Sequence, residues 1–320
     1  MTTPTVLVTG VTGLVGEAVV FKLLVDKSFP VIAAARGATR LHGLCPVVPF
    51  DLTQSLHLPC LRSVQVIVHC AARVHIMDDN ALDPLAEFRK VNVDGTLRLA
   101  QRAAESGVTR FIFISSIKVN GESTQPGRPF TAEDQPNPSD AYGASKYEAE
   151  EKLTELSRKT GMEVVIIRPP LVYGPGVKAN FLTMLSWLNK GVPLPLGAIR
   201  NQRSLVAITN LVSLIVTCIN HPAAPNQTFL VSDGEDISTT ELLQRLAIAL
   251  DKPVRLLSVP NKLLGWAAVL LGKRTFVNRI CGSLQVDIDK NRELLGWTPS
   301  MSMDIALLKT ARYFQEQRSK

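Results

Sequence analysis

The run Val6-Leu7-Val8-Thr9-Gly10-Val11-Thr12-Gly13-Leu14-Val15-Gly16 decides the fold class of this chain. An apolar strand pattern precedes three glycines in G-x-x-G-x-x-G spacing, and a helical pattern follows them. Glycines at such a strand–turn–helix permit a tight turn and let backbone N–H groups approach a pyrophosphate. The helix N-terminus adds partial positive charge. The sequence therefore predicts a dinucleotide-binding turn built from Gly10, Thr12, Gly13, Leu14, Val15 and Gly16.

The first half of the chain alternates short apolar runs with helical patterns. The predicted strands are Thr5–Thr9, Val31–Ala35, Cys45–Phe50, Val64–His69, Arg110–Ser115 and Val164–Arg168, and the predicted helices are Leu14–Val25, Leu85–Glu105 and Ala141–Thr160. Apolar strands separated by helices are typical of a parallel sheet covered on both faces. After Arg168 the pattern is mostly helical, with short strands such as Gln227–Val231.

We therefore predict an α/β fold, with a Rossmann-type doubly wound parallel sheet and a smaller, mostly helical C-terminal lobe. Residues 1–170 would form the dinucleotide-binding domain. Residues 171–320 would form a substrate-binding lobe, interleaved with the last strands of the sheet.

Composition excludes several classes of protein. The chain has 320 residues, 46% of them hydrophobic and 20% charged, which is enough to bury a sizeable core and excludes a disordered protein. The net charge of +7 comes from scattered basic residues, so a phosphate-bearing small substrate is expected rather than nucleic acid. The five cysteines lack metal-ligand spacing and are expected to be reduced, with no metal site. No signal peptide pattern opens the chain.

A membrane span is not expected either. The longest apolar run, Leu263–Leu271, is shorter than the roughly 20 residues that cross a bilayer. We expect it to be a packed helix, with a membrane-surface helix as the alternative. These features together predict a cytoplasmic protein.

The end of the second predicted strand bears on the choice of dinucleotide. An acidic residue there would bind the ribose 2′-hydroxyl of NAD, but the strand is followed by Arg36, with Arg40 beyond. An arginine can meet a 2′-phosphate or stack on adenine. This favours NADP(H), with NAD(H) kept open. Asp51-Leu52 closes the third strand, where the carboxylate of Asp51 can accept a hydrogen bond from the adenine amino group.

Tyr142 and Lys146 lie four residues apart in a predicted helix and so share one face. A free tyrosine has a pKa of about 10, and a neighbouring ammonium is expected to lower it. Lys146 can also reach the hydroxyls of the nicotinamide ribose. Ser116 follows a predicted strand, at the sheet edge where ligands sit in open α/β folds. We predict that Tyr142 exchanges a proton with an alcohol oxygen, oriented by Ser116, while hydride moves at carbon.

These motifs together resemble the extended short-chain dehydrogenases/reductases of the nucleotide-sugar epimerase/dehydratase group. The likeness rests on Thr9 to Gly16, Asp51-Leu52, His69-Cys70-Ala71-Ala72, Asn92 with Gly95-Thr96, Ser115-Ser116, Tyr142 to Lys146, and Arg168 with Tyr173-Gly174-Pro175-Gly176. It implies that Ser116, Tyr142 and Lys146 are catalytic. It also implies that the cofactor is lined by Cys70, Ala71, Ala72, Asn92 and Pro169.

Two sites in the sequence depart from the pattern of this family and bear on which reaction is expected. In the 4,6-dehydratases the two residues after the catalytic Ser/Thr are an acid and a base, whereas here they are Ile117 and Lys118. Isoleucine cannot transfer protons and a charged lysine is a poor base, so 4,6-dehydration is not expected. Leu171 stands where many relatives carry asparagine, which puts one substrate hydrogen bond in doubt.

More closely, the chain is similar to the bacterial 4-reductases of UDP-2-acetamido-2,6-dideoxy-4-hexuloses. These enzymes make UDP-N-acetylquinovosamine or UDP-N-acetylfucosamine for the O-antigen of lipopolysaccharide. The likeness is carried by Ala72 to Met77, Ser115 to Gly121, Arg168 to Phe181, Pro193 to Gly197 and Arg203 to Val206. We predict NAD(P)H-dependent reduction at C4 of such a sugar.

Two other functions stay open. The first is a UDP-hexose or UDP-N-acetylhexosamine 4-epimerase with tightly bound NAD, which uses the same catalytic groups twice. The second is a non-catalytic redox sensor, which the retained tyrosine–lysine pair disfavours.

The resemblance also implies a binding site for a UDP-sugar. Asn180 and Phe181 match the pair beside the diphosphate, Leu196 matches a residue beside uracil, and Arg203 matches a diphosphate arginine. Arg279 is the candidate for a second diphosphate arginine, and the sugar pocket would include Arg73, His75 and Lys118. The charge run 148–152 is expected to be a solvated helix face. A homodimer seam along helices 85–105 and 145–158 is possible by resemblance.

Overall fold

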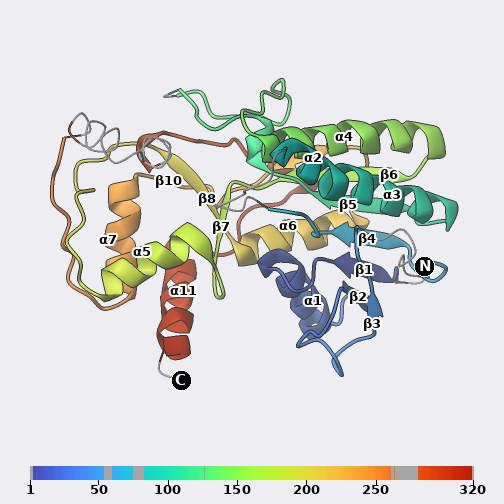
Figure 1. Ribbon diagram of the computed structural model, residues 1–320, viewed down its shortest axis with the longest axis horizontal. Helices are drawn as coiled ribbons and strands as arrows, with labels where there is room; N and C mark the ends of the chain where they lie inside the picture. The colour runs from blue at the N-terminus through green and yellow to red at the C-terminus, as the bar shows by residue number, and fades with distance from the viewer. Residues whose placement is uncertain are drawn as a thin grey trace.

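A parallel sheet is the central feature of the computed structural model, which describes residues 3–53, 60–74, 83–125, 127–260, 263 and 280–318. Within these residues seven parallel strands pair in the order β3-β2-β1-β4-β5-β6-β9 (Figure 1). Their bounds are β1 (Val6–Thr9), β2 (Val31–Ala35), β3 (Val47–Pro49), β4 (Val66–His69), β5 (Arg110–Ile114), β6 (Glu163–Arg168) and β9 (Thr228–Leu230). The strand order reverses between β1 and β4, which is where doubly wound sheets bind ligands.

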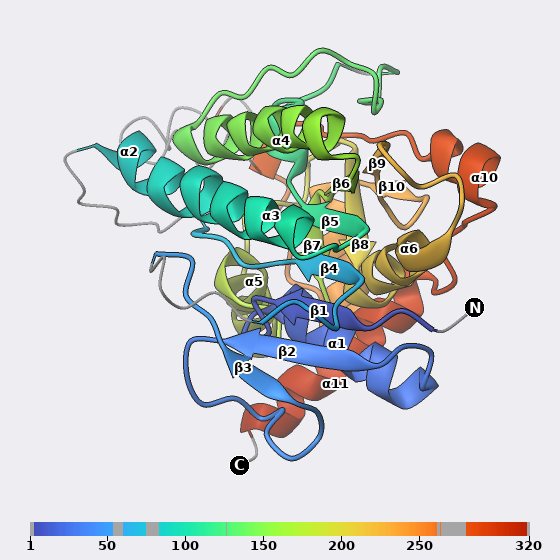
Figure 2. The same ribbon diagram turned by 90° about the vertical axis from the view of Figure 1, so that its right-hand side faces the viewer.

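Helices cover both faces of this sheet, and most residues of its strands are apolar and buried. In Figures 1 and 2, α1 (Leu14–Asp26) and α6 (Ile208–Asn220) lie on one face, and α3 (Thr96–Glu105) and α4 (Ala141–Thr160) on the other. The side chains of β1 alternate accordingly: Val6 and Val8 belong to one core cluster and Leu7 to the other. The predicted Rossmann-type fold is confirmed.

The prediction of one continuous helix over 85–105 was wrong. The chain forms α2 (Pro84–Phe88), then a π-helical segment η1 (Arg89–Gly95), and only then α3. Gly95 allows a close approach at the end of η1, because a Cβ there would lie 2.8 Å from the carbonyl oxygen of Leu52. Short π-helical segments inside α-helices are frequent at functional sites.

A second sheet organises much of the C-terminal half. It has the order β10-β8-β7, from β7 (Leu171–Tyr173), β8 (Arg203–Ala207) and β10 (Asp236–Ile237). Around a third core cluster pack α5 (Ala179–Asn189), α7 (Thr239–Ala249) and α11 (Met303–Arg318). Strand β9 and helix α10 (Asp289–Leu295) return to the main sheet. The boundary at residue 170 stays a prediction.

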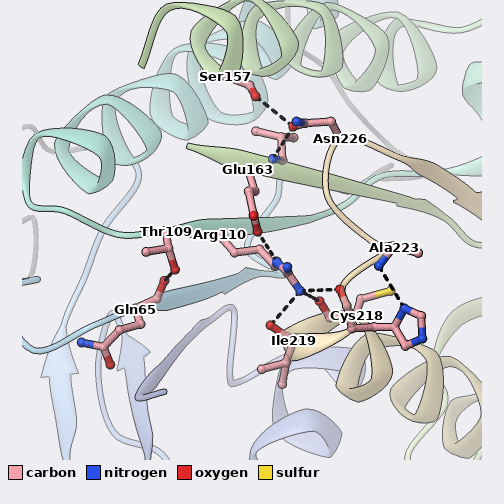
Figure 3. A network of polar contacts seen from close by, with 11 residues as sticks. Gln65, Thr109, Arg110, Ser157, Glu163, Cys218, Ile219, Ala223 and Asn226 are labelled. Carbon is pink, nitrogen blue, oxygen red and sulfur yellow. Dashed lines mark hydrogen bonds and ion pairs between the residues drawn. The ribbon is translucent and has the colours of Figure 1, made fainter. Parts of the chain in front are cut away.

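Arg110 joins the main sheet to the end of α6 (Figure 3). Its side chain is buried and pairs with Glu163 at 2.7 Å. Its Nη1 also donates to the carbonyl oxygens of Cys218 at 2.8 Å, Ile219 at 3.0 Å and His221 at 3.2 Å. The last carbonyls of a helix have no intrahelical partner, so this cation satisfies them and favours the negative end of the helix dipole.

The two halves also meet along the connection from β5 to α4. Phe130 N donates to the carbonyl oxygen of Gln285, and Asp287 N donates to that of Phe130, both at 2.8 Å. Thr124 N donates to Ser283 at 2.9 Å. A late segment of the chain is therefore hydrogen-bonded to the loop that leads into α4. No described helix is long and apolar enough to cross a bilayer.

Candidate active site

The glycine turn has no room for side chains. Gly10 has φ +70°, and a Cβ on it would lie 2.6 Å from the backbone N of Ala71. A Cβ on Gly16 would lie 2.4 Å from the carbonyl oxygen of Gly10. Gly13 N donates to the same oxygen at 2.9 Å, and no side chain caps α1, which begins at this turn. The free backbone N–H groups at the start of α1, next to a turn whose glycines have no side chains, fit a diphosphate.

The end of β4 lies directly against this turn. Ala71 N donates to Thr9 Oγ1 at 3.2 Å, and Thr9 Oγ1 contacts His69 Nδ1 at 2.8 Å. The other ring nitrogen of His69 contacts Thr96 Oγ1 at 3.1 Å. Burial lowers the pKa of His69 to about 3, so the ring is neutral and bridges two threonines. Cys70, Ala71 and Ala72 are thus held at the strand-order reversal, where the sequence placed the cofactor.

Lys146 lies in the interior, on the side of α4 that faces the sheet. Its side chain is 1% exposed, and Nζ lies 4.0 Å from the centre of the Phe113 ring. Burial lowers its pKa to about 7, against the opposing influence of the Glu150 carboxylate. The lysine therefore carries charge only part of the time at neutral pH.

Tyr142 is half-buried, one helical turn before Lys146. Its ring meets that of Phe88 edge-on, with 5.9 Å between the ring centres. Burial raises its pKa to about 12, and the carboxylate of Asp140 contributes in the same direction. The pKa of Tyr142 is thus raised where the sequence led us to expect a lowering by Lys146, because desolvation and the Asp140 carboxylate both disfavour the phenolate.

Ser116 stands at the carboxyl end of β5, where a short 3-10 turn, η2 (Ile117–Val119), begins. Its Oγ accepts from Lys118 N at 3.3 Å. Ile117 is buried, and its N donates to the carbonyl oxygen of the buried Pro169 at 3.0 Å. The hydroxyl is therefore presented by a short turn tied to the end of β6, at the same sheet edge as the glycine turn.

Glu150 corrects the expectation of a fully solvated charge run at 148–152. It is 3% exposed and accepts from the Arg168 guanidinium, with a shortest contact of 2.5 Å. It also accepts from the hydroxyl of Ser115, and Arg168 donates to Asn120 Oδ1 at 2.9 Å. Sequence reasoning missed this network. The available signal was spacing, because Glu150 follows Lys146 by four residues and shares its helix face.

Asn92 connects the end of β4 to the catalytic helix. Its Oδ1 accepts from Arg73 N at 2.8 Å, and its Nδ2 donates to the Arg73 carbonyl oxygen at 3.0 Å. The same Nδ2 contacts Ser145 Oγ at 3.0 Å. Its amide thus positions the loop after β4 relative to Lys146. A direct contact with cofactor stays a prediction.

The residues proposed for the adenosine end lie around the outer strands. Arg36 is exposed, Leu52 is buried, and Asp51 Oδ1 accepts from Thr53 N at 2.9 Å and from its hydroxyl at 2.8 Å. A cavity of 880 Å³ opens beside the glycine turn. Its lining includes Thr12, Gly13, Leu14, Arg40, Lys178 and Lys309. Arg40 pairs with Glu17 at 2.6 Å.

The residues predicted to bind the substrate differ in burial and contact different partners. Asn180 is exposed on α5, whereas Phe181 is buried and stacks on Tyr173 at 5.5 Å. The Leu196 carbonyl oxygen accepts from Thr240 Oγ1 at 2.6 Å. Arg203 Nη1 donates to the carbonyl oxygen of Gly282 at 3.0 Å.

Two of the three sugar-pocket residues are described. The guanidinium of Arg73 lies 5.6 Å from the centre of the Phe88 ring. Lys118 forms ion pairs with Asp140 and Glu122. His75, Arg279 and nearly all of the run Leu263–Leu271 lie outside the described residues.

Comparison with known proteins identifies the family. Residues 6–232 match the model of the NAD dependent epimerase/dehydratase family. The chain belongs to this family. Membership makes it an enzyme of the epimerase/dehydratase type, and the expected use of a nicotinamide dinucleotide agrees with it.

Three of the similar proteins are UDP-glucose 4-epimerases. A UDP-glucose 4-epimerase of Vibrio cholerae is 49% identical over 318 residues, covering 98% of this chain and 97% of that one. A UDP-glucose 4-epimerase of Mycolicibacterium smegmatis is 30% identical, covering 97% and 98%. The crystal structure of UDP-glucose 4-epimerase from Thermotoga maritima with UDP-glucose superposes with a TM-score of 0.79 at 22% identity, covering 98% and 99%. That last likeness supports the fold alone.

Proposed function

We propose that this enzyme is a nucleotide-sugar 4-epimerase acting on a UDP-hexose or UDP-N-acetylhexosamine. The observation that carries the proposal is the 49% identity to a UDP-glucose 4-epimerase along nearly the whole of both chains. The site is compatible with it, because an uncapped glycine turn, a buried lysine, a half-buried tyrosine and a serine share one sheet edge. This proposal replaces the C4 reduction favoured by the sequence as first choice.

The chain's own groups supply the acid–base part of such a reaction. Tyr142 would take the proton of the C4 hydroxyl and later return it to the C4 oxygen, while Ser116 orients that oxygen. Lys146, four residues after Tyr142 in α4, would favour the phenolate when it is charged. The glycine turn at Gly10, Gly13 and Gly16 would hold a bound NAD, whose chemistry would be reversible hydride exchange with C4 of the sugar. Because the proton and the hydride are both returned, epimerisation consumes no external reductant.

The structure also bears on dehydration. Ile117 is buried in the core, and Lys118 is engaged by two carboxylates. Neither group is available to remove a proton from C5 of a sugar. A 4,6-dehydratase activity is therefore not proposed.

A second candidate is the C4 reductase of a UDP-4-keto-6-deoxy-N-acetylhexosamine. It is favoured by one feature: β2 ends at Ala35 and is followed by Arg36, with no carboxylate for an NAD ribose. The cavity beside the glycine turn is lined by Lys178 and Lys309, which suit an additional phosphate, and by Arg40 in its ion pair with Glu17. An exchangeable NADPH would match a reductase, whereas an epimerase keeps its NAD.

One experiment separates the two candidates. Denatured protein is analysed for released nucleotide, and native protein is given either UDP-glucose or UDP-N-acetylglucosamine, with products resolved by NMR. We expect stoichiometric NAD and interconversion of the C4 epimers. A further sample receives NADPH and a UDP-4-keto-6-deoxy-N-acetylhexosamine. If the protein contains no NAD and oxidises NADPH only with this keto sugar, it is the reductase.

The tyrosine variant tests the assigned chemistry. Tyr142→Phe keeps the ring against Phe88 but removes the exchanging proton, so kcat is expected to fall by about 10²–10⁴. The content of bound nucleotide is expected to stay unchanged. The matched control is Tyr147→Phe, on the same helix α4, which should retain turnover. Equal activity of wild type and Tyr142→Phe would refute the role of Tyr142.

A further inference from the structure

Lys118 lies two residues after Ser116 and reaches across to the start of the catalytic helix. Its ammonium forms an ion pair with Asp140 and a second one with Glu122 at 3.2 Å. The other carboxylate oxygen of Asp140 accepts from Gly143 N at 2.7 Å and so caps α4. One aspartate therefore binds the serine turn and the tyrosine helix at once.

The backbones meet at the same place. A Cβ on Gly143 would lie 2.8 Å from the carbonyl oxygen of Lys118, so only glycine allows this approach. Gly143 follows Tyr142 directly, and Lys118 is in the turn that begins at Ser116. The contact between Lys118 and Asp140 thus lies where the turn that begins at Ser116 meets the start of α4.

Asp140 also acts on the tyrosine through its charge. A carboxylate near a phenol disfavours the phenolate, and Asp140 contributes to the raised pKa of Tyr142. A cation bound to that carboxylate offsets its field. The charged groups on the neighbouring elements are Lys146 on α4, Glu122, which pairs with Lys118, and Arg73, whose guanidinium lies over Phe88. Farther along the elements packed on α4, Arg89 pairs with Glu148 and Arg168 with Glu150.

We propose that Lys118 is a positioning residue that controls proton transfer at Tyr142 through Asp140. It neutralises the carboxylate that would otherwise hold the tyrosine in its protonated form, and it holds the serine turn against α4. The role rests on the proposed function of Tyr142 as the proton-exchanging group. It assigns Lys118 a task on the catalytic helix instead of a contact with the sugar.

The test reads the tyrosine directly, without substrate. The chain has four tyrosines, so protein labelled with 3-fluorotyrosine gives a small set of ¹⁹F signals, and Tyr142→Phe identifies the one that matters. Fluorination lowers the phenol pKa and brings the titration into a measurable range. Lys118→Met is expected to raise the pKa of Tyr142 by about one unit, and Asp140→Asn to lower it by about one unit. Asparagine still caps α4 in the second variant.

The double variant shows whether Lys118 acts through Asp140. In the Asp140→Asn background, adding Lys118→Met is expected to leave the Tyr142 titration unchanged. Lys118→Arg should restore most of the wild-type value, because it keeps the charge. Lys252→Met, an exposed lysine in the turn after α7, is the matched control. Circular dichroism and Tm of every variant establish that the fold is retained.

Two results would overturn the proposal: an unchanged Tyr142 titration in folded Lys118→Met, or a full shift that persists in the Asp140→Asn background. The second result would mean that Lys118 acts on the tyrosine directly. If the enzyme proves not to epimerise UDP-sugars, these titrations are unaffected. The proposed function and the role of Lys118 can therefore fail separately. In active enzyme, the pH profile of kcat should move with the same signs.

Discussion

The buried ammonium of Lys146 illustrates how a functional residue opposes stability. It is almost fully enclosed, and its main partner is the face of the Phe113 ring. Such a cation–π contact offsets part of the loss of hydration but not all of it, which is why burial lowers the pKa of Lys146 to about 7. The same environment keeps the lysine near the point of half-protonation at neutral pH.

Replacing this lysine should stabilise the fold and abolish turnover. The unfolded chain binds more protons than the folded one between about pH 7 and pH 10.5, so wild-type stability rises with pH through this window. Lys146→Met removes the group, so Tm of the nucleotide-free protein is expected to rise by about 2–6 °C near pH 7. The gain should shrink towards about pH 10.

Differential scanning calorimetry across this pH range checks the prediction. Lys252→Met, an exposed lysine, serves as the control and should show no such dependence. A lower Tm for Lys146→Met near neutral pH would show that the ammonium is stabilised in the interior.

At the scale of elements, α4 presents one face with three successive functional positions. Tyr142, Lys146 and Glu150 follow one another at four-residue spacing, from the sheet edge towards the middle of the helix. Glu150 fixes this face because it binds Arg168 from β6 and Ser115 from the end of β5. The catalytic helix is therefore held to both strands by one buried carboxylate.

Breaking this ion pair should loosen the helix. Arg168→Met leaves Glu150 as a buried charge without its cation, so the free energy of unfolding is expected to drop by about 3–5 kcal/mol. Adding Glu150→Leu to Arg168→Met should recover part of the loss, because an apolar pair replaces the isolated charge. Urea denaturation measures both variants. A loss below about 1 kcal/mol for Arg168→Met would show that the pair contributes as little as a surface salt bridge.

At the scale of the whole molecule, the candidate active site is formed by segments that are far apart in the sequence. The glycine turn after β1, the loop after β4 and helix α4 converge at the reversal of strand order, as Asn92, His69 and Gly10 show. The segment 283–287 then ties the C-terminal half to the loop before α4. A dinucleotide at this position would contact several of these segments at once.

Removing the nucleotide should therefore lower the stability of the whole protein. A ligand present at about 100 times its Kd stabilises the folded state by about 2.7 kcal/mol. We expect stripped protein to regain its Tm with NAD, and to respond more weakly to NADP, if the epimerase proposal holds. Thermal shift in matched concentrations of the two nucleotides measures this. A larger shift with NADP would favour the reductase.

Local patterns were sufficient to predict the sheet and the glycine turn, and they singled out Ser116, Tyr142 and Lys146, whose catalytic roles stay a prediction. These features depend on short-range signals: short continuous apolar runs, residues four apart on a helix, and three glycines within seven residues. Patterns of this kind also placed β9 correctly as a short strand near 227–231. The choice between epimerase and reductase was not contained in them, because both reactions use the same groups.

The sequence by itself determined that this chain is a doubly wound α/β enzyme with a Ser-Tyr-Lys set at one sheet edge. Only the tertiary structure decided that Glu150 is buried on Arg168, that Lys118 binds Asp140, and that helix 85–105 is interrupted by a π-helical segment. Each of these depends on partners brought together from different elements. Burial and ion pairing depend on which residues surround a side chain in the folded protein. The sequence pattern therefore predicts a solvent-exposed Glu150, whereas in the fold Glu150 is buried and paired with Arg168.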